Sequence, residues 1–141
     1  MKHLAQWNLQ RRQCAALYAN LLAPLSDNIG IPFEPEWSRA VYHLYVVRHA
    51  DRDALQAHLG ARGIGTGIHY PIPLHLQKAY KGLGYTAGDF PVSEKAALEM
   101  LSLPMFAHLQ PHQQHRAAEA VAEFVESRRP ALTLGASAGH F

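Results

Sequence analysis

The chain has 141 residues, of which 48% are hydrophobic and 17% are charged. This composition is typical of one globular domain with a sizeable core and excludes a disordered chain. The formal net charge of +2, with lysine and arginine scattered along the sequence, argues against nucleic acid or an acidic membrane surface as a partner.

The N-terminal residues and the cysteine content bear on the cellular compartment. Polar residues interrupt the apolar ones in residues 1–8, so this segment is no signal-peptide core. No apolar run approaches the roughly 20 residues of a membrane span. Cys14 is the single cysteine, which excludes an internal disulfide framework. We therefore expect a cytoplasmic protein.

Residues 2–22 are predicted to form a long helix that Pro24 ends. Its apolar residues recur mostly at three- and four-residue steps and make one stripe: Leu4, Trp7, Cys14, Leu17, Tyr18, Leu21 and Leu22. Because Cys14 lies within this stripe, we interpret it as a buried core residue and not as a nucleophile.

The middle of the chain predicts a compact βαβ-like unit. Residues 40–48 are rich in β-branched and aromatic residues, with both faces apolar as in a central strand, and His43 is interpreted as a core histidine. Asp51 is a suitable N-cap for a helix over 52–61, which Gly63 ends. Residues 64–70 are expected to form a second, short strand.

The remaining elements are predicted from prolines, glycines and apolar spacing. A short helix over 76–81 precedes a loop, and Pro91 opens a helix that runs to about residue 101. Residues 102–106 read as a brief extended segment. Pro111 opens the last helix, to about residue 128, and the aperiodic residues 130–141 are expected to be disordered.

Residues 65–77 are the most distinctive stretch of the sequence, and we take the rest of the chain to be organised around them. Gly65 and Gly67 permit positive φ or a close backbone approach, and Pro71 and Pro73 favour extended geometry. A stiff loop of this kind is a typical location for function, although it also fits a rigid turn whose polar groups satisfy one another. Four of its side chains are candidate binding residues: His69, Tyr70, His75 and Gln77.

Other kinds of site find little support in the sequence. Ten histidines raise the question of a metal, but His112 and His115 lack a third ligand at a recognised spacing. The chain has no Gly-x-Ser-x-Gly elbow and no Gly-x-Gly-x-x-Gly opening a helix. The loop therefore suits a wall that contacts a ligand better than a complete catalytic centre.

Residues 65–77, Gly-Thr-Gly-Ile-His-Tyr-Pro-Ile-Pro-Leu-His-Leu-Gln, closely resemble a signature near the C-terminus of the DegT/DnrJ/StrS sugar aminotransferases. The flanking segments agree in order: 43–48, 52–55, 84–85, 89–94 and 101–106. The N-terminal helix, with Trp7-Asn8 and Arg11-Arg12, is similar to the long helix that joins that family's two domains.

The resemblance implies the small C-terminal domain of the aspartate-aminotransferase architecture, an α/β (α+β sandwich) fold with a short, mostly antiparallel sheet packed by helices. The expected boundaries are a connector helix over 1–24, the small domain over 25–129 and the tail over 130–141. The implied activity is pyridoxal-phosphate-dependent transfer of an amino group to a keto-sugar carried on a nucleotide, in a homodimer. The implied substrate-side contacts are His69, Tyr70, His75 and Gln77.

The chain departs from the family in that the large cofactor-binding domain is absent. None of the four lysines, Lys2, Lys78, Lys81 and Lys95, matches the motif that forms the Schiff base. We therefore expect no catalytic residue and no pyridoxal phosphate in this chain alone, with the large domain as a partner. Two alternatives remain open: a free-standing nucleotide-sugar binding module, and an inactive remnant with an exposed apolar stripe on its first helix.

Overall fold

The computed structural model describes residues 2–128, so the predicted disordered tail lies outside the described residues. The helices are α1 (Leu4–Leu22), α2 (Arg52–Ala61), α3 (Pro91–Glu99) and α4 (Pro111–Ser127). The strands are β1 (Tyr45–Arg48) and β2 (Met100–Leu103), and three 3₁₀ segments are η1 (Ala23–Leu25), η2 (Leu74–Leu76) and η3 (Lys78–Leu83). This mixture confirms the predicted α/β class with a small antiparallel sheet.

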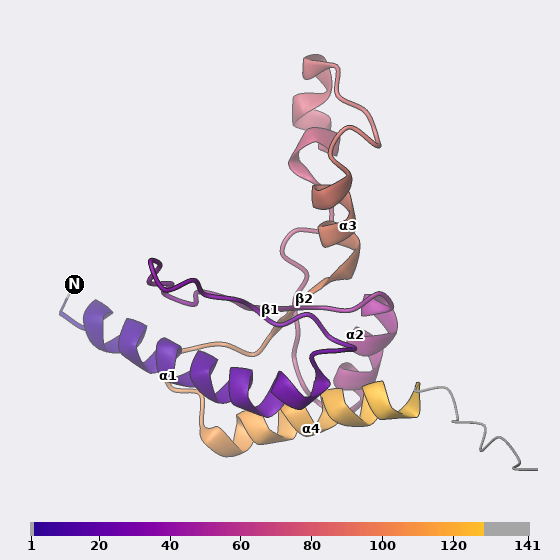
Figure 1. Ribbon diagram of the computed structural model, residues 1–141. Coiled ribbons are helices and arrows are strands. Elements are labelled where there is room, and N and C mark those ends of the chain that lie inside the picture. Colours follow the sequence, from indigo (N-terminus) through magenta and orange to yellow (C-terminus); the bar gives the residue numbers. More distant parts are fainter. Residues whose placement is uncertain (1, 129–141) are drawn as a thin grey trace, which may run out of the picture.

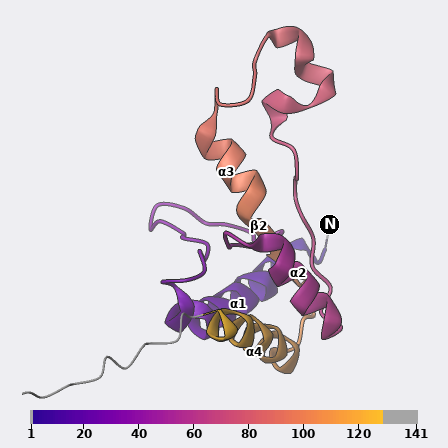
Figure 2. The same cartoon turned by 90° about the vertical axis from the view of Figure 1, so that its right-hand side faces the viewer.

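A compact body is formed by α1 and α4, which lie side by side beneath the sheet and α2 (Figures 1 and 2). The residues that α1 buries, Cys14, Ala15, Tyr18 and Leu22, recur at steps of one, three and four, so they share one face. Each fully buried large side chain contributes about 1.5–3 kcal/mol to stability. The largest hydrophobic ones are Tyr18, Leu22, Ile29, Tyr45, Val47, Leu55, Leu59, Leu101 and Val121.

The sheet is shorter than predicted. Strands β1 and β2 pair antiparallel from Tyr45 opposite Leu103 to Arg48 opposite Met100. The strand predicted over 40–48 begins only at residue 45, because Ala40 bonds side chains through its N–H and C=O and Tyr42 has φ of 47°. The prediction of a core histidine at position 43 was wrong as well, because this residue is exposed.

The predicted βαβ-like unit does not form. In place of a strand over 64–70, only Gly67 pairs with the sheet, in an isolated bridge to Ser102 of β2. Helix α2 has the predicted bounds, with Asp51 at its N-cap position and Gly63 at φ of 70° beyond its end. The Asp51 carboxylate makes no capping hydrogen bond and instead accepts one from Arg128, which lowers its pKa.

Residues 70–99, hereafter the arm, extend away from the body (Figures 1 and 2). The arm contains η2, η3 and α3, so the helix predicted over 76–81 is replaced by two 3₁₀ segments. Helix α3 ends at Glu99, since Met100 and Leu101 pair with β1. Within the arm only Ala97 is fully buried, so this segment has almost no core of its own.

Two arginines of the body fix the base of the arm. Arg52, itself buried, donates to the carbonyl oxygens of Ala97 and Met100 at 3.3 and 3.1 Å. Arg48 Nη2 pairs with Glu99 Oε2 at 2.7 Å. These contacts satisfy carbonyls at the end of α3 and set the direction in which the arm leaves the sheet. Over residues 2–128, no helix combines the length and the apolar character needed to cross a membrane.

Candidate functional site

His69 lies at the base of the arm, directly after the bridge that joins Gly67 to β2. Gly67 and Ser102 exchange both backbone hydrogen bonds, at 3.1 and 2.7 Å. His69 Nδ1 lies 2.9 Å from the hydroxyl oxygen of Ser102, which is buried. Strand β2 therefore holds the imidazole by one nitrogen, while the residue as a whole stays exposed.

Tyr70 is the first residue of the arm, and its side chain points into solvent. The residue is 73% exposed, and its ring meets that of His69 edge-on with 6.2 Å between the ring centres. Among the described residues its hydroxyl has no hydrogen-bond partner. Tyr70 is thus free to donate or accept a hydrogen bond toward a bound molecule.

The side chain of His75 is buried by contacts within the arm. Its side chain is 8% exposed, its Nε2 lies 3.0 Å from Glu94 Oε1, and its ring packs against Phe90 at 4.8 Å between centres. Glu94 also accepts from the N–H groups of Gly88 and Phe90, at 2.8 and 3.3 Å. The hydrogen bond from the Gly88 N–H lowers the pKa of Glu94, and the contacts with His75 and Phe90 lower it further against the opposing effect of burial, so these groups favour the carboxylate form.

Gln77 closes the proline-containing turn, because its amide nitrogen donates to the carbonyl oxygen of Ile72 at 3.3 Å. The four candidate residues therefore fall into two groups. His69 and Tyr70 are adjacent at the base of the arm, whereas His75 and Gln77 stabilise the arm itself. The rings of His69 and Tyr70 contact each other, whereas His75 and Gln77 each bond other residues of the arm.

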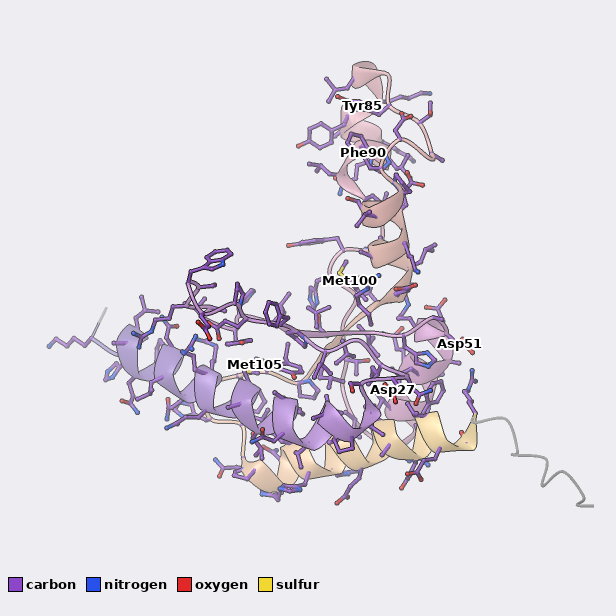
Figure 3. All side chains as sticks on the ribbon, in the orientation of Figure 1. Asp27, Asp51, Tyr85, Phe90, Met100 and Met105 are labelled. Carbon is purple, nitrogen blue, oxygen red and sulfur yellow. The ribbon has the colours of Figure 1, made fainter. Side chains whose placement is uncertain are left out.

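Sequence reasoning missed a set of aromatic residues farther along the arm. A hollow of about 280 Å³ opens between η2, η3 and α3. Tyr85 and Phe90, labelled on the arm in Figure 3, meet edge-on at 5.1 Å between ring centres. The signal was a cluster of aromatic residues in segments otherwise read as loop. The hollow is lined by Leu74, His75, Tyr80, Leu83, Tyr85, Phe90 and Ser93.

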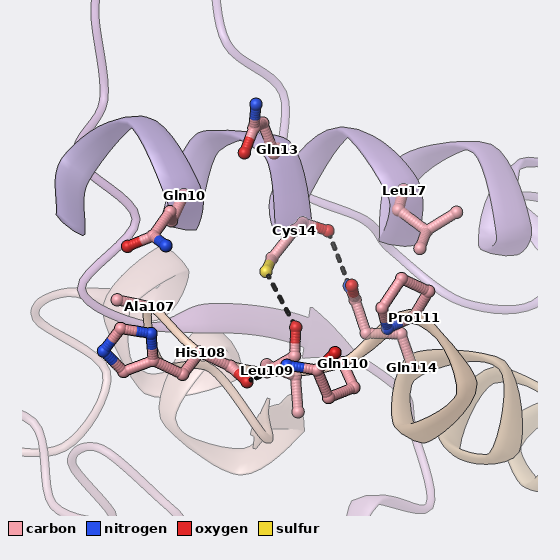
Figure 4. A pocket seen from close by; sticks show the side chains of 10 residues that line it. All are labelled: Gln10, Gln13, Cys14, Leu17, Ala107, His108, Leu109, Gln110, Pro111 and Gln114. Carbon is pink, nitrogen blue, oxygen red and sulfur yellow. Dashed lines mark hydrogen bonds between the residues drawn. The ribbon is translucent and has the colours of Figure 1, made fainter. Parts of the chain in front are cut away.

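A second hollow, of about 400 Å³, lies between α1 and the start of α4 (Figure 4). Across it the Cys14 thiol donates to the Leu109 carbonyl oxygen at 3.7 Å, and the buried Gln114 amide donates to the Cys14 carbonyl oxygen at 2.7 Å. Cys14 is buried, which confirms the prediction of a core position, and this burial raises the pKa of its thiol. None of the four candidate residues lines this hollow, which we interpret as a packing groove.

The residues of the chain do not fit a pyridoxal-phosphate site. A Schiff-base lysine must reach into an enclosed pocket beside the cofactor. All four lysines have exposed positions, and none lines the arm hollow or the hollow between α1 and α4. Nor do any three His, Cys, Asp or Glu side chains of the described residues gather closely enough to hold a metal ion.

Comparison with known proteins finds relatives that match most of this chain. A protein from Geobacillus stearothermophilus named pleiotropic regulatory protein is 46% identical over 123 residues, 86% of this chain and 33% of its own length. A dTDP-3-amino-3,4,6-trideoxy-alpha-D-glucose transaminase from Streptomyces venezuelae is 43% identical over 126 residues, 89% of this chain and 33% of its own length. The chain therefore spans about a third of the length of these relatives.

Solved structures show the same fold. S. venezuelae DesV, crystallised in complex with a ketimine intermediate, superposes with a TM-score of 0.84 at 43% identity, over 89% of this chain and 33% of its own. Bacillus subtilis NtdA with bound cofactor PMP gives a TM-score of 0.79 at 29% identity, over 89% and 30%. The model of the DegT/DnrJ/EryC1/StrS aminotransferase family matches residues 1–122, and the chain belongs to this family.

Proposed function

We propose that the chain is the C-terminal portion of a pyridoxal-phosphate-dependent aminotransferase that acts on a nucleotide-linked keto-sugar. The observation that carries this proposal is the exposed arm of a family member, with His69 and Tyr70 presented at its base. In this proposal the chain lines the substrate side of the active site in a cytoplasmic homodimer. The large domain, in the same assembly, holds the cofactor and supplies the catalytic lysine.

His69 and Tyr70 are the direct substrate contacts in this proposal. Ser102 holds His69 Nδ1, which leaves Nε2 to bond a sugar hydroxyl or a phosphate oxygen. Protonation of the imidazole would strengthen a contact to the nucleotide's diphosphate. The Tyr70 hydroxyl adds a second hydrogen bond from the adjacent position. Together they orient the substrate and perform no chemistry on the cofactor.

His75 and Gln77 contribute to substrate binding from within the arm. His75 Nε2 is engaged with Glu94, so only Nδ1 remains to contact a substrate. Gln77 keeps its amide oxygen for a ligand while its nitrogen bonds Ile72. These two residues therefore contribute mainly by holding the arm in its binding shape.

The arm buries almost none of its own side chains, which supports the proposal that it packs against a large domain. Its 30 residues leave large apolar side chains exposed, including Leu74, Leu83, Val92 and Leu98. Exposed apolar surface on this scale marks an interaction site. The apolar stripe predicted on the first helix is less exposed than the apolar residues of the arm. Leu4 and Trp7 of the stripe are exposed, but Leu21 packs against the core.

A fusion experiment tests the proposal. We expect the purified chain alone to show no visible absorbance band with pyridoxal phosphate and no turnover. The first two thirds of the S. venezuelae transaminase would be joined to this chain in place of its own matching third. Turnover of a dTDP-linked keto-sugar by this fusion protein supports the proposal. A folded, cofactor-loaded fusion protein without turnover contradicts it, and so does a lysine-dependent band in the chain alone.

A further inference from the structure

The loop before β1 presents two aromatic side chains almost completely to solvent. Phe33 is 87% exposed and Trp37 is 89% exposed. Leaving such side chains in water forgoes about 1.5–3 kcal/mol each compared with burial. Single exposed apolar residues are ordinary, but two large aromatic residues this exposed, four positions apart in one short loop, are unusual enough to indicate a binding role.

This loop is held in place, with the Glu34 carboxylate at its centre. Glu34 Oε1 accepts from Arg12 Nη1 of α1 at 2.7 Å and from the Ala40 N–H at 2.6 Å. Glu34 Oε2 accepts from the Tyr42 hydroxyl at 2.9 Å, and Arg12 also donates to the Ala40 carbonyl oxygen at 2.7 Å. We call this set of contacts the Glu34 clasp. The clasp joins both ends of the loop to α1 and fixes its backbone.

Backbone features inside the loop add to its rigidity. Pro32 and Pro35 restrict φ on either side of Glu34, and Ser38 N–H closes a turn onto the Pro35 carbonyl oxygen at 2.9 Å. A groove of about 280 Å³ is lined by residues of the loop, Phe33 among them, and by Tyr42 and Val46. Aromatic side chains on a fixed loop lose little conformational entropy on binding, which is the property of interface anchors.

We propose that the Phe33–Trp37 loop is a preorganised docking element that anchors this domain to the large domain of the aminotransferase. This inference rests on the proposed function, because it takes the large domain as the occupant. The loop lies within residues 1–122, the part that matches the family, while the chain spans about a third of the relatives. About two thirds of each relative's length lies outside the match, and that part offers a protein surface on which the loop can dock.

The Glu34 clasp also connects the loop to α1, which corresponds to the predicted connector helix. Arg12 belongs to α1, which resembles the helix joining the two domains, so the ion pair between Arg12 and Glu34 ties the loop to that helix. Docking of Phe33 and Trp37 therefore fixes the large domain relative to α1. The arm, which carries the substrate contacts, is attached to the same body through Arg48 and Arg52.

Hydroxyl-radical footprinting tests the docking directly, with the chain alone and the fusion protein compared at equal concentration. We expect the oxidation rate of Trp37 to fall roughly tenfold in the fusion protein, since interface anchors are fully desolvated. Phe33 should be protected in parallel. His112 and His115, exposed at the start of α4, serve as internal standards whose oxidation should not change.

Variants separate docking from folding. In the isolated chain, Trp37→Ala should leave the unfolding midpoint unchanged. In the fusion protein the same substitution should lower the midpoint, whereas Trp37→Phe should keep most of the original value. Unchanged Trp37 oxidation in a fusion protein that turns over substrate would overturn the docking inference and leave the proposed function standing. Concentration-dependent protection of Trp37 in the chain alone would also overturn it, because the occupant would then be a second copy.

Discussion

The imidazole of His69 lies over the backbone of Gly67, so closely that a Cβ added to Gly67 would come within 2.5 Å of His69 Cε1. Real Cβ atoms do not approach a ring to that distance, so the His69 ring can hold this position only while residue 67 is a glycine. The glycine and the Ser102 hydroxyl together set the position of His69. A candidate substrate contact is therefore placed by the bridge that ties the arm to β2.

Gly67→Ala is expected to displace the His69 ring and break its contact with Ser102. The added methyl group should cost about 1 kcal/mol or more of unfolding free energy, as overpacking usually does. Urea unfolding measures the cost, and the NMR shifts of the His69 ring report its position. Gly65→Ala is the matched control, because nothing lies within 4 Å of the added Cβ. Equal effects of the two substitutions would refute this placement of His69.

Two buried tyrosines should respond differently to loss of the hydroxyl. Tyr18 donates to the Pro104 carbonyl oxygen at 3.1 Å, whereas the buried Tyr45 hydroxyl has no partner among the described residues. Tyr18→Phe should therefore lower the unfolding free energy by about 1 kcal/mol. Tyr45→Phe should change it little or raise it. Urea unfolding of the two variants gives the comparison, and a greater loss from Tyr45→Phe would contradict it.

The Glu34 clasp should weaken in acid. The hydrogen bond from Arg12, followed by that from the Ala40 N–H, lowers the pKa of Glu34 from 4.5 to about 2. A carboxyl group with a lowered pKa in the folded state stabilises that state fully above its ordinary pKa, and this stabilisation is lost as the pH falls. The difference in unfolding free energy between the unmodified chain and Glu34→Gln should thus be constant above pH 4.5 and shrink between pH 4.5 and 2.

Urea titrations across this pH range check the Glu34 prediction. Glu36→Gln is the control, because Glu36 lies in the same loop, is exposed and makes no hydrogen bond among the described contacts. The Glu36 variant should follow the unmodified chain at every pH. A Glu34→Gln variant that keeps the same acid dependence as the unmodified chain would show that the clasp is not formed in solution.

The arm should loosen when Glu94 is removed. Glu94→Ala deletes the acceptor for the Gly88 and Phe90 N–H groups and for His75. Amide hydrogen exchange at Gly88 and Phe90 should accelerate roughly tenfold, since local opening sets the exchange rate in such segments. Lys95→Ala is the control, because its ion pair with Glu99, at 3.7 Å, is exposed and weak. Unchanged exchange in Glu94→Ala would mean that other contacts hold the arm.

The sequence predicted the helices well because their signals are local. Apolar spacing, Pro111 and Gly63 marked α1, α2 and α4 to within about two residues. The strand predicted over 40–48 failed in its first half because a contact far along the chain, between Arg12 and Glu34, takes the polar groups of Ala40. Such a contact leaves no trace in residue periodicity.

The sequence predicted which segment carries the candidate site, but not how the side chains of that segment are arranged in space. The glycines and prolines identified residues 65–77 as a stiff loop, and Gly67 makes the expected close approach. The burial of His75 depends on Glu94, 19 residues away in an element read only as a helix. The aromatic hollow likewise requires η3 and α3 to fold toward each other. Partners of this kind are set by tertiary packing, which a single sequence does not show.

The most direct test of the account is the steady-state kinetics of the fusion protein with His69→Ala and Tyr70→Phe. The account predicts that each substitution raises KM for the nucleotide-linked keto-sugar, while the visible absorbance of the bound cofactor stays unchanged, because these residues contact substrate only. The loss of one hydrogen bond corresponds to about 1 kcal/mol, or roughly a fivefold rise in KM. Unchanged KM in both variants, or a cofactor band removed by either, would contradict it.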